Sequence, residues 1–399
     1  MTKDRPRLRV LVRLNSLELG GTQINAVDLA AELRGHGIAS HLVGPRASAR
    51  PGPSLLDVAA ARGVTVEPYD PAPGLRAHAR QLTEAADRVR ADVVHVYGSW
   101  GGDRPVFWGP ARGGRRPWVQ TVYEMQVAPV ILRNVPLVVG TGYLLDEAHD
   151  RPGHTVLISP PVDVDADRPG GADGAGFRER HGIGPDEVLL GIVSRLDTDM
   201  KAAPVGHAID AMRVLGTRGA SLVVVGTGDA EVALRERAGT VNRDVGREVV
   251  RFAGPLADPR PAYAASDVVL GMGGSAARAL ASGTPLVVQG EAGWSCLFEP
   301  STAERLARSS YWSPEPSDDA VGGLVRAVSR LLDDRARRAE LGRFGRQFAV
   351  ERFGLPAMAG RLAALYEESG RLYTAREWAA DLAQEAARVA RKAVTRSAT

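Results

Sequence analysis

Short runs of aliphatic and β-branched residues alternate along the chain with longer segments in which alanine, leucine and arginine recur at helical spacing. Such runs predict buried strands of a parallel sheet, and the periodic segments predict the helices that connect them. In the first half the predicted strands are residues 9–14, 40–45, 61–69, 92–98, 117–124, 137–142 and 155–161. In the second half they are residues 188–196, 220–228, 247–254, 266–272 and 284–290. The fold class is therefore α/β.

The chain is long enough to form two domains. At 399 residues the chain fits two domains of ordinary size, and a stretch rich in proline, aspartate and glycine, residues 159–174, predicts the connection between them. We therefore predict an N-terminal domain over 1–162, a C-terminal domain over 163–350, and helices over 351–399 that pack back on the first domain. Two such domains predict a cleft between them, with a hinge at the connection.

Composition excludes several classes of protein. The 44% hydrophobic and 24% charged residues are typical of a folded globular chain. No apolar run is long enough to span a membrane, and the first residues lack the apolar stretch of a signal peptide, which predicts a cytoplasmic location. The single cysteine, Cys296, predicts a packed thiol. The net charge of +3 comes from scattered residues, so we expect no nucleic-acid partner.

A glycine turn separates the first predicted strand from the first predicted helix. Gly20, Gly21 and Thr22 lie where the backbone amides of a helix N-terminus attract anions. The three spaced glycines of the dinucleotide fingerprint are missing, which disfavours a nicotinamide or flavin cofactor. The turn predicts a phosphate or acceptor contact, with a plain strand-to-helix turn as the alternative.

The segment 194–201 follows the first strand of the second half and is the strongest chemical signal. Arg195 and Lys201 could neutralise one diphosphate, the arginine in bidentate fashion and the lysine as a point charge. Lysine is rare in this chain, with only three among 50 basic residues, so Lys201 calls for a chemical explanation. The alternative is two solvated charges on a loop. Asp197 and Asp199 imitate a metal-binding pair, but their place between two cations favours a structural role.

A second anion site is predicted where the strand at 266–272 meets the following helix. Gly273, Gly274 and Ser275 open that helix, so their amides and the helix dipole would attract a phosphate. Further residues are placed to line a nucleotide pocket: Gly226, Gly228, Phe252 and Gly254.

Together these stretches resemble the retaining glycosyltransferases of group 1, family four, over roughly residues 8–368. The segments that carry the resemblance, in the family's order, are LGGTQINAVDLAAELRGHG, DVVHVYG, ISPPVDVDADRP, GIVSRLDTDMKA, LVVVGTGD, VVRFAGPLADPRPAYAASDVVL and RALASGTPLVV. The resemblance implies the GT-B fold, two facing Rossmann-like domains with parallel sheets and an interdomain cleft. It also implies that Arg195 and Lys201 hold the donor diphosphate, that no metal is needed, and that the anomeric configuration is retained.

The chain departs from the family at the donor-sugar positions. Leu270 and Arg278 stand where the family has two glutamates that bind donor sugar and ribose. An arginine cannot accept hydrogen bonds from ribose hydroxyls, so we predict a rearranged pocket in which Glu291 supplies a carboxylate beside Met272, with Arg278 at the nucleotide. One additional residue also separates Arg195 from Lys201.

Three residues of the first half are candidates for acceptor contacts. Tyr123 and Glu124 stand where the family has a His-Asp pair, and His95 ends a predicted strand. Glu124 could act as an acid or base, or be a solvated loop residue. For His95 the alternative is a buried strand histidine.

The predicted function is transfer of a sugar from a nucleoside diphosphate donor to an acceptor hydroxyl, in antibiotic or glycan biosynthesis. The partners are the sugar nucleotide and a small-molecule or glycan acceptor. Loss of both family glutamates keeps two alternatives open: a catalytically silent sugar-nucleotide binder, and a relative that joins a nucleotide-linked cyclitol to an acceptor.

Overall fold

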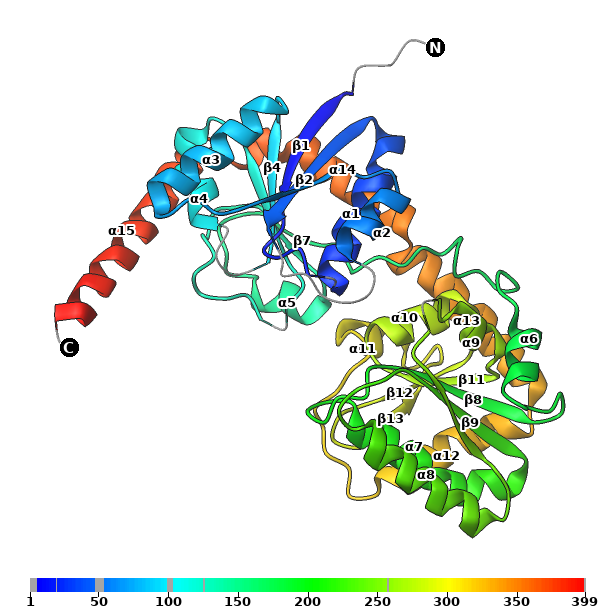
Figure 1. Cartoon of the computed structure of the whole chain (residues 1–399). Helices are drawn as coiled ribbons and strands as arrows, with labels where there is room; N and C mark the ends of the chain where they lie inside the picture. The colour runs from blue at the N-terminus through cyan, green and yellow to red at the C-terminus, as the bar shows by residue number, and fades with distance from the viewer. Residues whose placement is uncertain are drawn as a thin grey trace, which may run out of the picture. The chain divides into compact units, whose positions relative to one another are not determined.

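Two separate β-sheets organise the chain, which was analysed as a computed structural model (Figure 1). The structure describes residues 6–18, 20–46, 54–98, 103–124, 126–256 and 258–397. The chain divides into two units, the first formed by Met1–Pro161 with Leu355–Thr399 and the second by Val162–Gly354. The chain thus passes from the first unit into the second and returns to the first through its last two helices.

The first unit contains a parallel sheet of seven strands in the order β3-β2-β1-β4-β5-β6-β7. The strands are β1 (Leu8–Arg13), β2 (Ile38–Pro45), β3 (Val66–Tyr69), β4 (Val93–Tyr97), β5 (Trp118–Val122), β6 (Leu137–Val139) and β7 (Thr155–Leu157). Its helices are α1 (Gly21–Glu32), η1 (Leu33–His36), α2 (Leu55–Ala61), α3 (Leu75–Arg88), α4 (Asp103–Trp108), η2 (Arg112–Gly114), α5 (Gly142–Glu147), α14 (Leu355–Leu372) and α15 (Ala375–Ser397).

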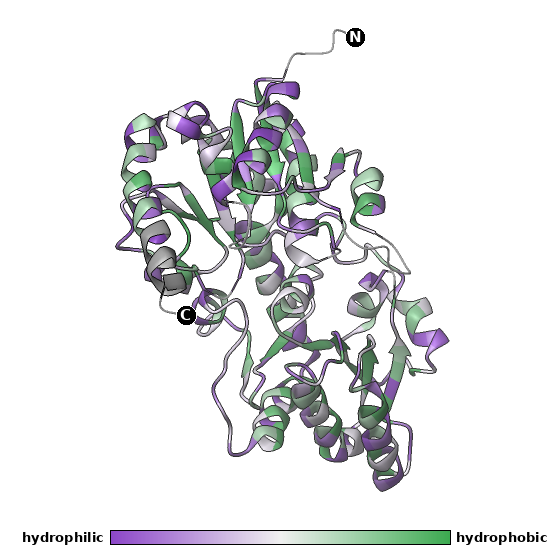
Figure 2. Ribbon diagram, turned by 60° about the vertical axis from the view of Figure 1, so that its left-hand side comes forward, coloured by the Kyte–Doolittle hydropathy of each residue, from purple (hydrophilic) through white to green (hydrophobic). Residues whose placement is uncertain are grey.

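Both faces of this sheet are buried, because successive side chains of a strand point to opposite faces. In β1, Val10 and Val12 join the core under α1 and α14, whereas Leu11 joins the core under α3 and α4. Figure 2 shows the consequence, since the strands are coloured as hydrophobic while the helices carry both hydrophobic and hydrophilic residues. The continuous apolar runs of the sequence are therefore explained by burial on two sides.

The second unit contains six strands in the order β10-β9-β8-β11-β12-β13. The strands are β8 (Val188–Val193), β9 (Ala220–Val225), β10 (Val250–Gly254), β11 (Val268–Gly271), β12 (Leu286–Gln289) and β13 (Ser295–Leu297). The helices are α6 (Gly174–Arg180), α7 (Ala202–Leu215), η3 (Gly216–Arg218), α8 (Glu231–Val245), α9 (Arg260–Ala265), α10 (Gly274–Ala281), α11 (Ala303–Arg308), α12 (Ala320–Leu332) and α13 (Arg335–Phe353). Helices α7, α8 and α12 cover one face, and α9, α10 and α13 cover the other.

The predicted parallel sheets are confirmed except for one short edge strand that was not predicted, because β13 runs antiparallel to β12. The turn between them is closed by a hydrogen bond from the amide of Gly290 to the carbonyl of Trp294, at 2.7 Å. So short a connection can only reverse the chain, since a parallel crossover needs a dozen or more residues.

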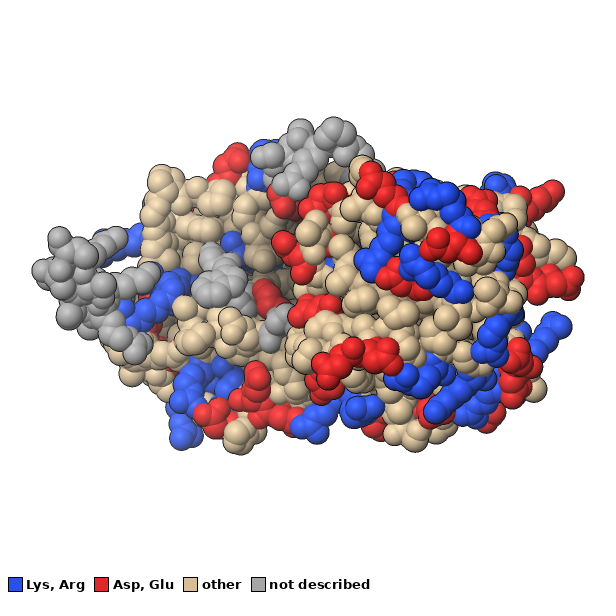
Figure 3. All heavy atoms as spheres, turned by 90° about the horizontal axis from the view of Figure 1, so that it is seen from below, with Lys and Arg blue, Asp and Glu red and all other residues tan. Residues whose placement is uncertain are grey.

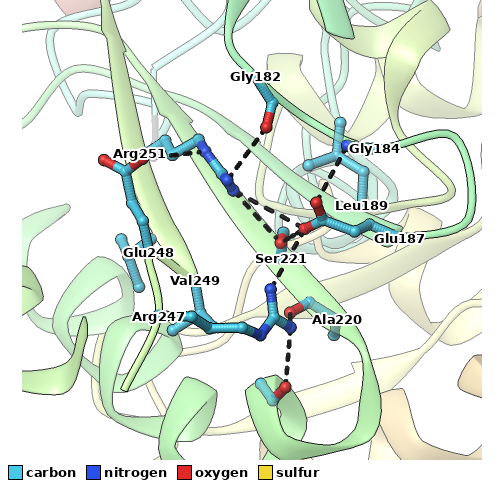
Figure 4. A network of polar contacts seen from close by, with 12 residues as sticks. Gly182, Gly184, Glu187, Leu189, Ala220, Ser221, Arg247, Glu248, Val249 and Arg251 are labelled. Carbon is cyan, nitrogen blue, oxygen red and sulfur yellow. Dashed lines mark hydrogen bonds and ion pairs between the residues drawn. The ribbon is translucent and has the colours of Figure 1, made fainter. Parts of the chain in front are cut away.

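A network of polar side chains lies at the N-terminal ends of β8 and β9 (Figure 4). Glu187 accepts a hydrogen bond from the amide of Gly184 at 3.0 Å and one from the hydroxyl of Ser221. Arg247 and Arg251 approach the same carboxylate at 3.4 and 3.8 Å. Burial alone would raise the pKa of Glu187, but the hydrogen bonds and the two guanidiniums outweigh it and hold the pKa below its ordinary value.

Glu187→Gln is expected to cost about 1–3 kcal/mol of unfolding free energy at neutral pH, the value of hydrogen bonds to a charged group. Because the folded-state pKa is lowered, this stabilisation is present above the unfolded pKa and is lost as the pH falls through the folded value. Urea unfolding of the wild type and of Glu187→Gln, measured between pH 7 and pH 3, should show that their difference in unfolding free energy shrinks as the pH falls. Glu248→Gln is the control, because Glu248 is 66% exposed and pairs with Arg251 at the surface. A loss as large as that of Glu187→Gln would contradict the prediction.

Candidate functional site

The strand order of the second unit reverses between β8 and β11, which are hydrogen-bonded neighbours. In open α/β sheets, ligands bind outside the carboxyl ends of the strands at such a reversal. The segment 194–201 follows β8, and Met272 and Gly273 follow β11. The two predicted anion-binding segments therefore lie on the two sides of this switch point.

The loop after β8 is held against the loop after β9 by backbone hydrogen bonds. The amide of Ser194 donates to Val225 at 3.0 Å, and that of Leu196 donates to Thr227 at 3.0 Å. Gly226 and Gly228 permit this approach, because a Cβ there would lie 1.8 Å from the carbonyl oxygen of Ser194 and 2.4 Å from that of Leu196. These two glycines, predicted to line a nucleotide pocket, thus shape the loop that carries Arg195.

Arg195 and Lys201 lie at the two ends of this loop. The Arg195 side chain is 81% exposed and contacts Asp197 at 3.1 Å. Lys201 is half-buried at the N-terminus of α7, and its ammonium has no hydrogen bond or ion pair to any residue that the structure describes. Burial lowers the pKa of Lys201, and Arg195 lowers it further, whereas the carboxylates of Asp197 and Glu291 oppose the shift. A half-buried cation without a partner, beside the positive end of a helix, is arranged to receive an anion.

Glu291 reaches this cluster from the turn between β12 and β13. The end of β12 is tied to α7, since the Gln289 side chain donates to the carbonyl of Pro204 at 3.1 Å. The carboxylate of Glu291 is close enough to affect the pKa of Lys201. Of the predicted donor-site residues, Arg195 and Glu291 are therefore within electrostatic range of Lys201.

The turn after β11 presents backbone amides. Gly273 adopts φ 56° and ψ −127°, a conformation that favours glycine, and it caps the eight-residue helix α10. The first hydrogen bond to its carbonyl comes from Ala277 at 3.1 Å, so the amides of Gly274 and Ser275 belong to the first turn, whose N–H groups have no partner within a helix. The Ser275 hydroxyl is engaged with the backbone of Met272, to which it donates at 3.0 Å.

Leu270 and Arg278, which stand at the positions of the family's two glutamates, lie in different environments. Leu270 is 1% exposed and packs in the core under α7 and α8, and Met272 is also buried. Arg278 is exposed on α10 and lines a cavity of about 410 Å³ that it shares with Asp167 and Arg338. Burial raises the pKa of Asp167, and the charge of Arg278 opposes that shift.

Two further predicted pocket residues lie at the end of β10. The ring of Phe252 packs against the core and is covered by the guanidinium of Arg235, 4.6 Å from the ring centroid. Gly254 follows an irregularity in the pairing of β10 with β9, and its carbonyl accepts from the amide of Gly226 at 2.9 Å. Phe252 therefore presents little of its ring to a ligand, whereas Gly254 remains at the edge of the sheet.

The glycine turn of the first unit also lies at a strand-order reversal, between β1 and β4. Gly20 is the N-cap of α1 and is extended, Gly21 is exposed and Thr22 is half-buried. The neighbouring Gln23 donates to Asn15 at 3.0 Å, which connects the helix start to the loop after β1. The first-turn amides of α1 thus lie at the edge where ligands of such sheets collect.

His95 has no exposed surface. Its two ring nitrogens lie 2.6 Å from the hydroxyl of Tyr366 and 2.7 Å from that of Thr121. Burial lowers the pKa of His95 to about 3, so the ring is neutral. These are the contacts of a core residue that fastens α14 to the sheet, rather than those of an acceptor contact.

Tyr123 and Glu124 follow β5, and both are half-buried. The ring of Tyr123 packs edge-on against Tyr97 at 6.3 Å, and burial raises the pKa of its hydroxyl. Both residues lie at the carboxyl edge of the first sheet, the same edge as the glycine turn.

One residue that supports the site was not predicted. Asp229 accepts hydrogen bonds from the amide and the hydroxyl of Thr198, at 3.0 and 3.1 Å, and so fixes the middle of the loop after β8. The signal was present, because Asp229 directly follows the Gly226–Gly228 turn.

Within the described part of the chain no group of three or more His, Cys, Asp or Glu side chains could hold a metal ion. None of the helices described is long and apolar enough to cross a membrane.

Comparison with known proteins matches part of the chain to a family. Residues 187–334 match the family described as glycosyl transferases, group 1. A 2-deoxystreptamine glucosyltransferase of Streptomyces kanamyceticus is 31% identical over 227 residues, which are 53% of this chain and 54% of the relative, so the match spans about half of its length.

Solved structures share the fold over most of the chain. A glycosyltransferase from Rickettsia africae ESF-5 superposes with a TM-score of 0.71 at 12% identity, covering 91% of this chain and 99% of that one. The structure of HepE of Anabaena in complex with UDP superposes with a TM-score of 0.68 at 17% identity, covering 90% of this chain and 100% of that one. The predicted resemblance to group 1 glycosyltransferases and the GT-B fold are thus confirmed.

Proposed function

We propose, from the match of residues 187–334 to the group 1 glycosyl transferases, that this protein transfers a sugar from a nucleoside diphosphate donor to an acceptor hydroxyl. The observation that carries the proposal is the charge cluster at the switch point of the second sheet. There the charges of Arg195 and Glu291 act on the ammonium of Lys201, at the N-terminus of α7. Two cations and one carboxylate suit a ligand that has both phosphate and hydroxyl groups.

The cluster would act mainly on the leaving group. As the bond between the sugar C1 and the diphosphate oxygen breaks, negative charge grows on the diphosphate, and Arg195 and Lys201 stabilise it. The new bond from C1 to the acceptor oxygen forms on the same face, and the acceptor proton passes to the departing phosphate oxygen. The configuration at C1 is thereby retained, and no protein nucleophile takes part.

We propose a UDP-sugar as the donor and an amine-bearing cyclitol as the acceptor. Structures with the same fold include HepE in complex with UDP and with UDP-glucose. The relative from Streptomyces kanamyceticus has 2-deoxystreptamine in its name. Such a step would belong to the biosynthesis of a secondary metabolite. The acceptor would bind the first unit, where Tyr123, Glu124 and the glycine turn share one sheet edge.

A catalytically silent sugar-nucleotide binder is the second candidate, and the burial of Leu270 favours it. At that position the family uses a glutamate that grips the donor sugar, whereas here an apolar side chain is packed in the core. Lys201 and Arg195 could still hold a diphosphate without positioning the sugar. Binding without turnover would then be observed.

A thermal-shift panel of UDP, GDP, ADP, CDP and TDP tests the proposal, because a ligand that binds only the folded state raises the melting temperature. We expect UDP to raise the melting temperature of the wild type and to leave Arg195→Ala unchanged. Incubation with UDP-glucose and 2-deoxystreptamine should then release UDP and form a glycosylated product. Binding without a product for any sugar nucleotide would favour the silent binder, and no response to any nucleotide would overturn both candidates.

A further inference from the structure

The first unit has a groove, distinct from the site of the second unit, that runs along α3 beside α4, η2 and α15. Figure 1 shows α3 and α4 side by side, with α15 leading away from them. The groove has a volume of about 1030 Å³, at the upper limit of the size range of small-molecule sites. We call it the arginine groove after the five arginines that line it, Arg76, Arg80, Arg104, Arg112 and Arg115.

Small residues make room for the groove at its floor. A Cβ at Gly109 would lie 2.4 Å from the carbonyl oxygen of Ala79, so α3 and the end of α4 are in backbone contact there. No atom would meet a Cβ at Gly113, which leaves that side of the groove open. Trp108 forms part of the wall and donates from its indole to Glu385 at 3.2 Å.

One carboxylate lines the groove, and it is already occupied. Glu385 is 2% exposed and accepts a charge-assisted hydrogen bond from Arg104 at 2.5 Å, which fastens α15 to α4. Arg115 pairs with Asp87 at 3.3 Å, and Arg80 lies 3.8 Å from Glu84. These contacts account for three of the five guanidiniums.

The other two guanidiniums, those of Arg76 and Arg112, are exposed and have no side-chain hydrogen bond or ion pair among the residues that the structure describes. The whole chain carries a net charge of only +3, and acidic and basic side chains are interspersed over the face seen in Figure 3. Five arginines against the three carboxylates of Glu385, Asp87 and Glu84 therefore leave a local excess of positive charge. Guanidinium groups in such a groove match phosphate oxygens, which they bind in bidentate fashion.

We propose that the arginine groove binds a ligand with two or more phosphate groups, with Arg76 and Arg112 as its main donors. The ligand is either a free small molecule or the phosphorylated headgroup of a lipid. This site is independent of the proposed donor site, because all of its residues belong to the first unit.

Calorimetric titration with inorganic triphosphate tests the proposal in full-length protein carrying Arg195→Ala and Lys201→Ala, which removes the main phosphate contacts of the donor site. One triphosphate ion per protein molecule should still bind to this double variant. Adding Arg76→Glu and Arg112→Glu should weaken binding by at least about tenfold, because two charge-assisted contacts become repulsive. The matched control is Arg361→Glu with Arg371→Glu, since both are exposed on α14 and neither lines the groove. Vesicles of phosphatidylcholine with and without cardiolipin, whose headgroup carries two phosphates, test the lipid source with the same variants.

Each outcome bears on the proposal. Loss of triphosphate binding only in the groove variant supports a free phosphorylated ligand, and loss of binding to cardiolipin vesicles only in that variant supports the headgroup. The proposal is overturned if the background protein binds neither probe, or if the control variant loses binding as much as the groove variant. Melting temperatures near that of the parent protein in both charge-reversal variants would show that the differences do not come from unfolding.

Discussion

Arg195→Ala and Lys201→Ala are each expected to lower kcat by about 30- to 1,000-fold, equivalent to roughly 2–4 kcal/mol of transition-state stabilisation. Negative charge develops on the leaving diphosphate, and the two side chains would be its main counter-charges. Both substitutions should leave folding intact, since Arg195 is largely exposed and the ammonium of Lys201 contacts no described partner. Initial rates with UDP-glucose at saturating acceptor, together with melting temperatures, measure both effects.

Met200→Ala provides the control in the same loop. Met200 is 40% exposed and adjacent to Lys201, so its loss should change neither kcat nor stability appreciably. Turnover near the wild-type rate in both Arg195→Ala and Lys201→Ala would contradict the assignment of the diphosphate site. The pH profile gives an independent readout, because the lowered pKa of Lys201 makes its ammonium lose its proton below the usual 10.5. The alkaline limb of the rate should therefore move to higher pH in Lys201→Arg.

Local signals account for much of what the sequence predicted. Strands such as β1 and β8 are buried on both faces, so their composition alone distinguishes them from helices. The loop that carries Arg195 and Lys201 was predictable because it directly follows a strand, and the carboxyl ends of parallel strands are where ligands bind.

The rest depended on contacts between distant parts of the chain. The surroundings of His95 are completed by Tyr366, which lies 271 residues further along. No pattern around His95 could show that a helix from the far end of the chain would cover it. The direction of the Arg278 side chain, toward the cavity with Asp167, likewise depends on how the connection at 166–175 packs against α10. The antiparallel β13 is three residues long, too short to show a pattern of its own.

The second large effect is expected at Gly226. In Gly226→Ala the new Cβ would lie 1.8 Å from the carbonyl oxygen of Ser194, and the residue would have to keep a φ of 139°. Positive φ and overpacking each cost about 1–3 kcal/mol, so the second unit should lose roughly 3 kcal/mol. That loss corresponds to a melting temperature lowered by about 6–12 °C for a domain of this size. Calorimetric scans of the purified protein measure it directly.

Gly246→Ala separates the close contact from backbone strain. Gly246 also has a positive φ, 78°, but a Cβ there would meet no atom within 4 Å. Only the strain of the left-handed conformation remains, about 1–2 kcal/mol, so the melting temperature should fall by only about 2–8 °C. Equal losses in the two variants would show that the contact with Ser194 is not what requires glycine at 226. If the losses differ as expected, Gly226→Ala should also weaken UDP binding, because relief of the clash displaces the carbonyl of Ser194 and with it the loop that carries Arg195.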